Sequence, residues 1–119
     1  MNKQEYVEFI SSYEVDEERI AKVKELYSIE QATDLFERIV SAAGEVTSFD
    51  EERRALTFDG IIYANEDLGV DFAERGIVPV IDAYNLDYIV YMINEAKWGI
   101  YNISDDDVYD ESDDLLKLL

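Results

Sequence analysis

The sequence predicts an α+β domain, in which N-terminal helices pack on a C-terminal antiparallel β-meander and a short helix ends the chain. The first observation behind this prediction is the stretch 76–103, where β-branched and aromatic runs alternate with polar turns. The second is the spacing of three and four between apolar residues before it, which is typical of amphipathic helices. The third is size, because 119 residues with 48% hydrophobic side chains suit a single domain, 1–119.

Two helices are predicted at the start of the chain. The first is indicated by apolar residues at intervals of three and four, namely Tyr6, Phe9, Ile10 and Tyr13. Asp16 is placed to cap the second helix, with Val15 and Ile20 in the two positions of a hydrophobic staple. Its expected buried stripe consists of Ile20, Val23 and Tyr27.

A third helix is predicted to begin at Ser28, because Ser28-Ile29-Glu30-Gln31 has the spacing of a capping box. Its apolar positions keep strict spacing until Gly44, where we expect it to end: Ala32, Leu35, Phe36, Ile39, Val40 and Ala43. Ser48-Phe49-Asp50-Glu51 repeats the capping signal, but the charged run 51–54 is equally compatible with one helical turn in a loop.

A further helix is predicted from Thr57 to the stop signal at Gly69, with Gly60 tolerated at a cost of about 1 kcal/mol relative to alanine. Its apolar positions are Ile61, Ile62, Ala64 and Leu68. Val70 and Phe72 are then expected to pack as the chain enters the meander.

Three consecutive strands are predicted in the meander, separated by turns of hairpin length at 82–87 and 94–97. Pro79 cannot donate a ladder hydrogen bond, so we expect the first strand at an edge or with that N–H side unpaired. Trp98 lies in the third strand. Core packing is the favoured role of Tyr88 and Tyr91, whereas Tyr84, in the first turn, is expected to be exposed and available to a partner.

The segment 105–114 contains seven carboxylates and no basic residue. An EF-hand loop aligned on Asp105 would place Asp110 where glycine is needed and Leu116 where the closing glutamate belongs. We therefore expect a solvated acidic turn that binds no metal. Ser112 is the expected cap of a short terminal helix that carries Leu115, Leu116, Leu118 and Leu119.

The charge of the chain limits its partners, because 29 acidic and 10 basic residues give a net charge of −19. Nucleic acid and anionic membranes would be repelled, so neither is expected to bind, whereas a basic protein would be attracted. The alternative is that the excess acid only keeps the protein soluble and monomeric. The lack of histidine and cysteine excludes Ser-His-Asp triads, Cys-His pairs, histidine-ligated zinc and cysteine-ligated clusters. We expect a cytoplasmic monomer or weak dimer without a cofactor.

The second half of the chain shows a particular order of features. NEDLGVDF is followed by a strand that contains proline and ends in an acidic residue (77–82), an Asp-Tyr strand (87–91), a third strand (98–103) and an acidic-to-leucine helix (112–119). This order resembles the SUKH superfamily, which includes the fungal cell-wall (glucan) synthesis regulators and many bacterial immunity proteins.

The resemblance implies a protein-binding α+β domain without enzymatic activity. Bacterial members are thought to neutralise a cognate toxin, commonly a nuclease or deaminase, by direct binding, and an acidic surface suits an active site that attracts polyanions. From the resemblance and the charge together we expect a basic toxin domain as the partner. The predicted binding face consists of Tyr84, Asn85, Asp87, Asp105, Asp106 and Asp107. Two alternatives remain open: a cytoplasmic regulatory or scaffold domain, and an enzyme that uses two carboxylates.

Overall fold

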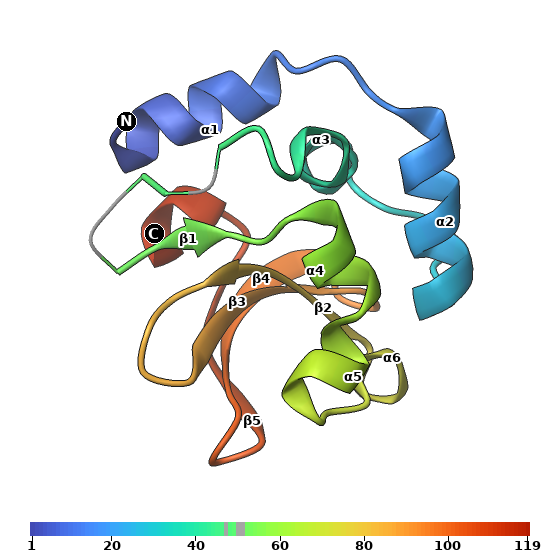
Figure 1. Cartoon of the computed structure of the whole chain (residues 1–119). Helices are drawn as coiled ribbons and strands as arrows, with labels where there is room; N and C mark the ends of the chain where they lie inside the picture. The colour runs from blue at the N-terminus through green and yellow to red at the C-terminus, as the bar shows by residue number, and fades with distance from the viewer. Residues whose placement is uncertain (47, 50–51) are drawn as a thin grey trace.

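The computed structural model describes residues 1–46, 48–49 and 52–119, which form an α+β fold as predicted (Figure 1). The N-terminal helices are α1 (Lys3–Ser11), α2 (Glu17–Tyr27) and α3 (Asp34–Ala42). Strand β1 (Arg54–Ala55) and the short helices α4 (Phe58–Ile62), α5 (Ala64–Leu68) and α6 (Phe72–Arg75) follow. The C-terminal part consists of β2 (Ile77–Asp82), β3 (Asp87–Met92), β4 (Lys97–Asn102), β5 (Asp107–Ser112) and the 3-10 turn η1 (Leu115–Leu118).

The strands form one antiparallel sheet in the order β1-β2-β3-β4-β5. The three predicted strands are therefore confirmed as β2, β3 and β4, and the sheet has one further strand on each side. The prediction of a solvated turn throughout 105–114 is wrong, because β5 pairs with β4 from Asp107 opposite Asn102 to Ser112 opposite Trp98. Carboxylates disfavour a central strand, but they are common on an edge strand whose outer side faces water.

Pro79 lies in a strand that is not at the edge of the sheet, since β2 has neighbours on both sides. However, β1 pairs only with Ile81 and Asp82, so Pro79 lies outside that pairing. The register between β2 and β3 is also irregular between Pro79 and Ile81. A proline is tolerated in this inner strand because β1 is too short to pair with it and the register with β3 is irregular there.

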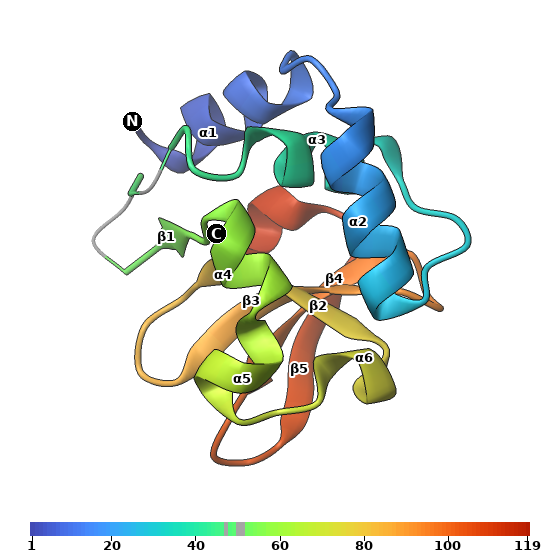
Figure 2. The ribbon, with the colours of Figure 1, turned by 45° about the vertical axis from the view of Figure 1, so that its right-hand side comes forward.

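Aromatic side chains cover both faces of the sheet. The ring of Tyr91 stacks on Phe36 of α3 at a centroid distance of 4.3 Å and contacts Trp98 at 5.2 Å. Tyr101 lies on the opposite face, because side chains alternate along β4, and it contacts Phe72 of α6 at 5.6 Å. The sheet therefore lies between a layer that contains α1 and α3 and a layer that contains α5 and α6, as Figure 2 shows. Trp98 is only 3% exposed, as its place in the predicted core requires.

The predicted cap of the second helix and the predicted apolar positions of the first two helices agree with the structure. The side chain of Asp16 accepts hydrogen bonds from the backbone N–H groups of Glu18 and Arg19 at 3.1 Å each. The stripe predicted for α2 is buried and consists of Ile20, Val23 and Tyr27. In α1, Tyr6 and Ile10 are buried, and the Tyr6 ring stacks on Phe49 at 4.1 Å.

The predicted start of the third helix is wrong. Ser28 ends α2 in the left-handed conformation, with φ at 57°, whereas α3 begins at Asp34 behind Thr33, whose side chain accepts from the N–H of Phe36. A serine that directly follows a helix can serve its C-terminus, and Thr33 offers the next helix an equivalent N-terminal cap.

Three further predictions need correction or completion. The helix predicted from Thr57 to Gly69 is divided at Tyr63 into α4 and α5. The terminal leucines form a 3-10 turn capped by Asp114 rather than by Ser112, which ends β5. Of the capping signal at 48–51, residues 50 and 51 lie outside the described residues, and Arg54 belongs to β1 rather than to a helical turn.

Candidate protein-binding site

Two hairpin turns lie at the same end of the sheet, because strands in a meander run alternately up and down. They are the β2–β3 turn (83–86) and the β4–β5 turn (103–106). The backbone carbonyl of Leu86 accepts a hydrogen bond from the N–H of Ile103 at 3.0 Å, which joins the two turns directly. Both turns lie on the side of the molecule away from α2 (Figures 1 and 2). The structure thus brings together the two halves of the predicted binding face.

The β2–β3 turn has an unusual backbone. Tyr84, Asn85 and Leu86 follow one another with φ values of 73°, 56° and 69°, in the left-handed region that costs a residue other than glycine about 1 kcal/mol. Tyr84 and Leu86 are nevertheless 63% and 53% exposed. The turn therefore holds two large apolar side chains in water, on a backbone conformation that their residue types disfavour.

Hydrogen bonds hold this turn in place. The N–H of Tyr84 donates to Oδ1 of Asp82 at 2.9 Å, and the N–H of Asp87 donates to the carbonyl of Tyr84 at 3.1 Å. The carbonyl of Ala83 accepts from Nη1 of Arg53 at 3.1 Å. These bonds offset the backbone strain, so the exposed side chains are presented from an ordered loop.

Asp87 links the β2–β3 turn to the edge of the sheet. Its Oδ1 accepts from Nδ2 of Asn102 at 2.8 Å, and its Oδ2 accepts from the hydroxyl of Tyr109 at 2.6 Å. The hydrogen bond to Asp87 raises the pKa of Tyr109 to about 12, because the bonded carboxylate stabilises the protonated phenol. Tyr109 is 41% exposed, and its hydrogen bond to Asp87 holds it against the turn.

The carboxylate of Asp106 forms an ion pair within the chain, with Arg75. Its two oxygens accept from Nε and Nη2 of Arg75 at 2.7 and 3.0 Å, and the hydroxyl of Tyr101 donates to the same carboxylate. The hydrogen bonds from Arg75 and Tyr101 lower the pKa of Asp106 to about 2. Asp106 therefore ties the β4–β5 turn to α6, and it is less suited to partner binding than its neighbours.

Asp105 and Asp107 differ from Asp106 in this respect. Both are exposed, and in the part of the chain that the structure describes neither has an ion-pair partner. We define the docking end as the surface formed by Tyr84, Asn85, Leu86, Asp87, Asp105, Asp107 and Tyr109. It combines exposed aromatic and aliphatic side chains with carboxylates around them.

Leu86 and Tyr109 belong to the docking end but were not among the predicted residues. Leu86 is a large aliphatic side chain in a turn, where polar residues are more common. Tyr109 falls in the segment predicted as a solvated acidic turn, although Val108-Tyr109 is a pair of strand-forming residues within it. Both signals were present in the sequence, but only the pairing of β5 with β4 gives Tyr109 its contact with Asp87.

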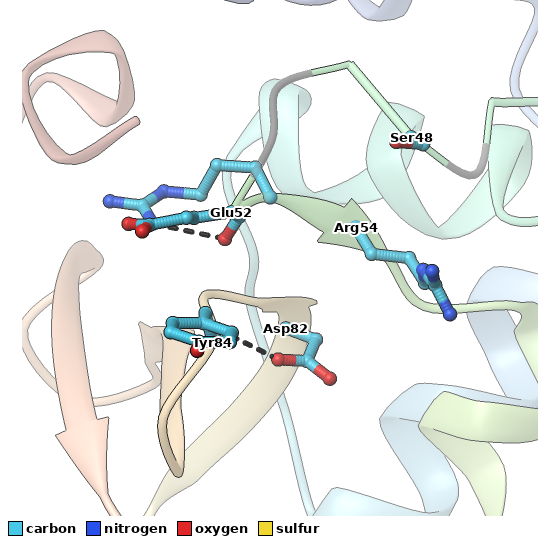
Figure 3. Close-up of a pocket in the computed structure, with 6 residues that line it drawn as sticks. Ser48, Glu52, Arg54, Asp82 and Tyr84 are labelled. Carbon is cyan, nitrogen blue, oxygen red and sulfur yellow. Dashed lines mark hydrogen bonds between the residues drawn. The ribbon is translucent and has the colours of Figure 1, made fainter.

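A hollow of about 240 Å³ adjoins the docking end at Tyr84 (Figure 3). Its lining residues are Ser48, Glu52, Arg53, Arg54, Asp82 and Tyr84, so it contains charges of both signs. Among the described residues, no three acidic side chains are grouped so that they could hold a metal ion.

Comparison with known proteins adds no relative, since no family model, curated protein or solved structure matches the chain. Within the described ranges, no helix is both long and apolar enough to cross a membrane.

Proposed function

We propose that this protein is a cytoplasmic, non-enzymatic binding domain of SUKH immunity type, which neutralises a basic, nuclease-like toxin domain by direct contact. The observation that carries the proposal is the docking end, where Tyr84 and Leu86 are more than half exposed on an ordered, strained turn. Large apolar side chains held in water on a costly backbone conformation suggest that a partner covers them.

The apolar residues supply the expected affinity. An exposed tyrosine has few rotatable bonds, so burying it in a partner's pocket removes much apolar surface at little entropic cost. The hydrogen bonds from Tyr84 to Asp82 and from Asp87 to Tyr84 keep the loop ordered before binding. Such preorganisation lowers the entropy that association has to overcome.

The carboxylates supply the expected choice of partner. Asp105 and Asp107 lie beside the apolar residues, and the whole chain has a net charge of −19. This field attracts a basic protein over distances of about 10 Å at moderate salt. A nuclease-like toxin fits, because its active site has to attract a polyanion.

The test is co-expression with the product of the adjacent gene, followed by affinity measurement. Tyr84→Ala/Leu86→Ala should weaken binding by about tenfold or more, chiefly through faster dissociation. Tyr63→Ala/Leu26→Ala is a matched control, because it removes the same residue types from positions that are 54% and 43% exposed on other elements.

Two results would contradict the proposal. An adjacent product that does not bind would remove the immunity function and favour a regulatory or scaffold domain. A control variant that loses as much affinity as the docking-end variant would show that binding takes place elsewhere.

A further inference from the structure

Strand β5 is the last strand of the sheet, and in the described part of the chain no strand pairs with its outer edge. Asp107, Tyr109, Asp110 and Glu111 are exposed, and only Val108 and Ser112 are half-buried. A strand at such an edge presents backbone donors and acceptors to any extended chain that approaches it. The N–H of Val108 donates to Oδ1 of Asp107 at 2.9 Å, and an added strand would replace this local hydrogen bond.

Two hollows flank β5. One, of about 290 Å³, is lined by Tyr101, Asp106, Asp107 and Val108 among others. The other, of about 540 Å³, is lined by Ile100, Asp110, Leu118 and Leu119 among others. Because Ile100 and Tyr101 are neighbours in β4, their side chains point to opposite faces, and the hollows lie on the two sides of the sheet.

The negative charge of β5 favours pairing with a basic strand. Asp107, Asp110 and Glu111 lie in the strand, and no basic residue occurs between Arg75 and Glu111 except Lys97, which forms an ion pair with Glu111 at 2.9 Å. Two copies of β5 placed side by side would bring like charges together, so self-pairing is disfavoured. A strand with lysine or arginine would instead find opposite charges.

We propose that β5 accepts an extended basic segment of the partner protein as an additional strand. Backbone hydrogen bonds would supply affinity, and alternate side chains would enter the two hollows. A basic side chain suits the hollow at Asp107, because Arg75, which also lines it, is paired with Asp106. An apolar side chain can lie against the aliphatic part of the other hollow, while the rest of its lining carries charges of both signs: Arg53, Asp110, Glu111 and Lys117. This inference rests on the proposed function in that it takes a basic protein as the partner.

The backbone of β5 limits the length of this pairing. Asp110 has a φ of 53°, and the register between β4 and β5 shifts between Trp98 and Ile100. A bulge of this kind interrupts a regular ladder. The added strand should therefore pair mainly with 107–109, next to the docking end.

The test uses a synthetic octapeptide of alternating lysine and valine, with blocked ends, and hydrogen exchange of individual backbone amides followed by NMR. At saturating peptide, the amides of 107–109 that point away from β4 should exchange about tenfold more slowly, because added ladder hydrogen bonds protect them. The same peptide with every backbone nitrogen methylated is the control, since it has the same side chains and charge but no N–H to donate to a ladder.

Variants then separate the edge from general charge. Asp107→Asn/Asp110→Asn should weaken binding of the lysine–valine peptide at least about threefold at low salt, since two opposing charges are lost. Glu25→Gln/Glu30→Gln makes the same change in net charge at exposed positions on α2 and the following loop. This control should weaken binding of the lysine–valine peptide less than the β5 variant does.

Three outcomes would overturn the inference: no protection of β5, equal protection by the N-methylated peptide, or equal loss in both variants. None of them decides the proposed function, which is tested with the full partner and the Tyr84 and Leu86 substitutions. Conversely, an adjacent gene product that fails to bind would contradict the proposed function. The peptide experiment would still decide whether β5 accepts an added strand.

Discussion

The β3–β4 pair and the β4–β5 pair share one strand but differ in their surroundings. Between β3 and β4 the register is continuous from Asp87 opposite Asn102 to Met92 opposite Lys97, and the side chains between are largely buried. Between β4 and β5 the register shifts, and most of β5 is exposed. The same ladder geometry therefore supports the core on one side of β4 and an open, charged surface on the other.

The two strand pairs divide the sheet into a part that stabilises the fold and a part that is exposed to a partner. A residue in β3 or in the buried face of β4 should affect folding strongly, because its contacts come from both neighbouring strands and a helix. A residue in β5 should affect folding weakly and binding more, because half of its surroundings is water. Substitutions on the two sides of β4 can test this separation.

The largest effects are expected in the β3–β4 pair. Ile89→Asp would bury a charge at a position that is 0% exposed, and Trp98→Ala would leave a cavity beside Tyr91. Trp98→Ala should lower the free energy of unfolding by about 3–5 kcal/mol in urea titrations. Tyr109→Ala in β5 is the comparison and should cost about 1 kcal/mol, mainly for its lost hydrogen bond to Asp87. A Trp98→Ala loss below about 0.5 kcal/mol would contradict the assignment of the indole to the core.

Gly99→Ala should have an intermediate effect, because it lies at the boundary between the two pairs. A methyl group there would approach Cγ1 of Val108 to 2.5 Å and Sδ of Met92 to 3.2 Å. We expect a loss of about 1–3 kcal/mol from overpacking, measured by urea unfolding.

The second step of this experiment is Val108→Ala in the Gly99→Ala background. It should restore part of the lost stability, since β5 is the less constrained partner and its side chain is the obstacle. If stability does not recover, the contact that excludes the added methyl group is the one with Met92 of β3 rather than the one with Val108 of β5.

A smaller effect on stability is expected at Asp106, and it should depend on pH. The pKa of Asp106 is lowered from 3.8 to about 2 by its hydrogen bonds from Arg75 and Tyr101. A carboxylate with a lowered pKa stabilises the folded state above its unfolded pKa and loses that contribution as pH falls through the folded value. The stability advantage of the wild type over Asp106→Asn should therefore be present at pH 6 and shrink between about pH 4 and pH 2.

The measurement is the difference in urea midpoint between the two proteins at each pH. Asp105→Asn is the matched control, because it removes a neighbouring carboxylate that has no ion-pair partner among the described residues. A difference between wild type and Asp106→Asn that stays constant from pH 6 to pH 2 would mean that the contact with Arg75 does not stabilise the fold.

The smallest effect on stability, and a selective one on binding, is expected for Asp105→Asn/Asp107→Asn. These exposed carboxylates should change the association rate with a basic partner by a few-fold at low salt, with little change in dissociation. Stopped-flow association at two salt concentrations, with Glu25→Gln/Glu30→Gln as control, measures this. An unchanged rate at low salt would show that these two residues do not steer the partner.

Local patterns in the sequence were sufficient for much of the fold. The runs of β-branched and aromatic residues located β2, β3 and β4, and the polar turns between them set their ends. The cap at Asp16 and the buried stripe of α2 were also predictable, because both depend on residues a few positions apart. The exposure of Tyr84 followed from its place in a turn.

Competition between local signals explains the helix predictions that were wrong. Ser28 fits the N-terminus of one helix and the C-terminus of another, and α2 uses it as its end. Thr33 was then available to begin α3. Nothing within a few residues of Ser28 decides between these two roles.

The sequence by itself determined the fold class, the three inner strands and the acidic character of the chain, because periodicity, turn residues and net charge act locally or add up over the whole chain. Tertiary structure alone decided that 107–112 forms a strand, that Asp106 pairs with Arg75 and that Leu86 meets Ile103. An acidic segment becomes a strand only when a neighbouring strand supplies its hydrogen bonds. A carboxylate becomes internal rather than available to a partner only when the fold brings a distant arginine to it.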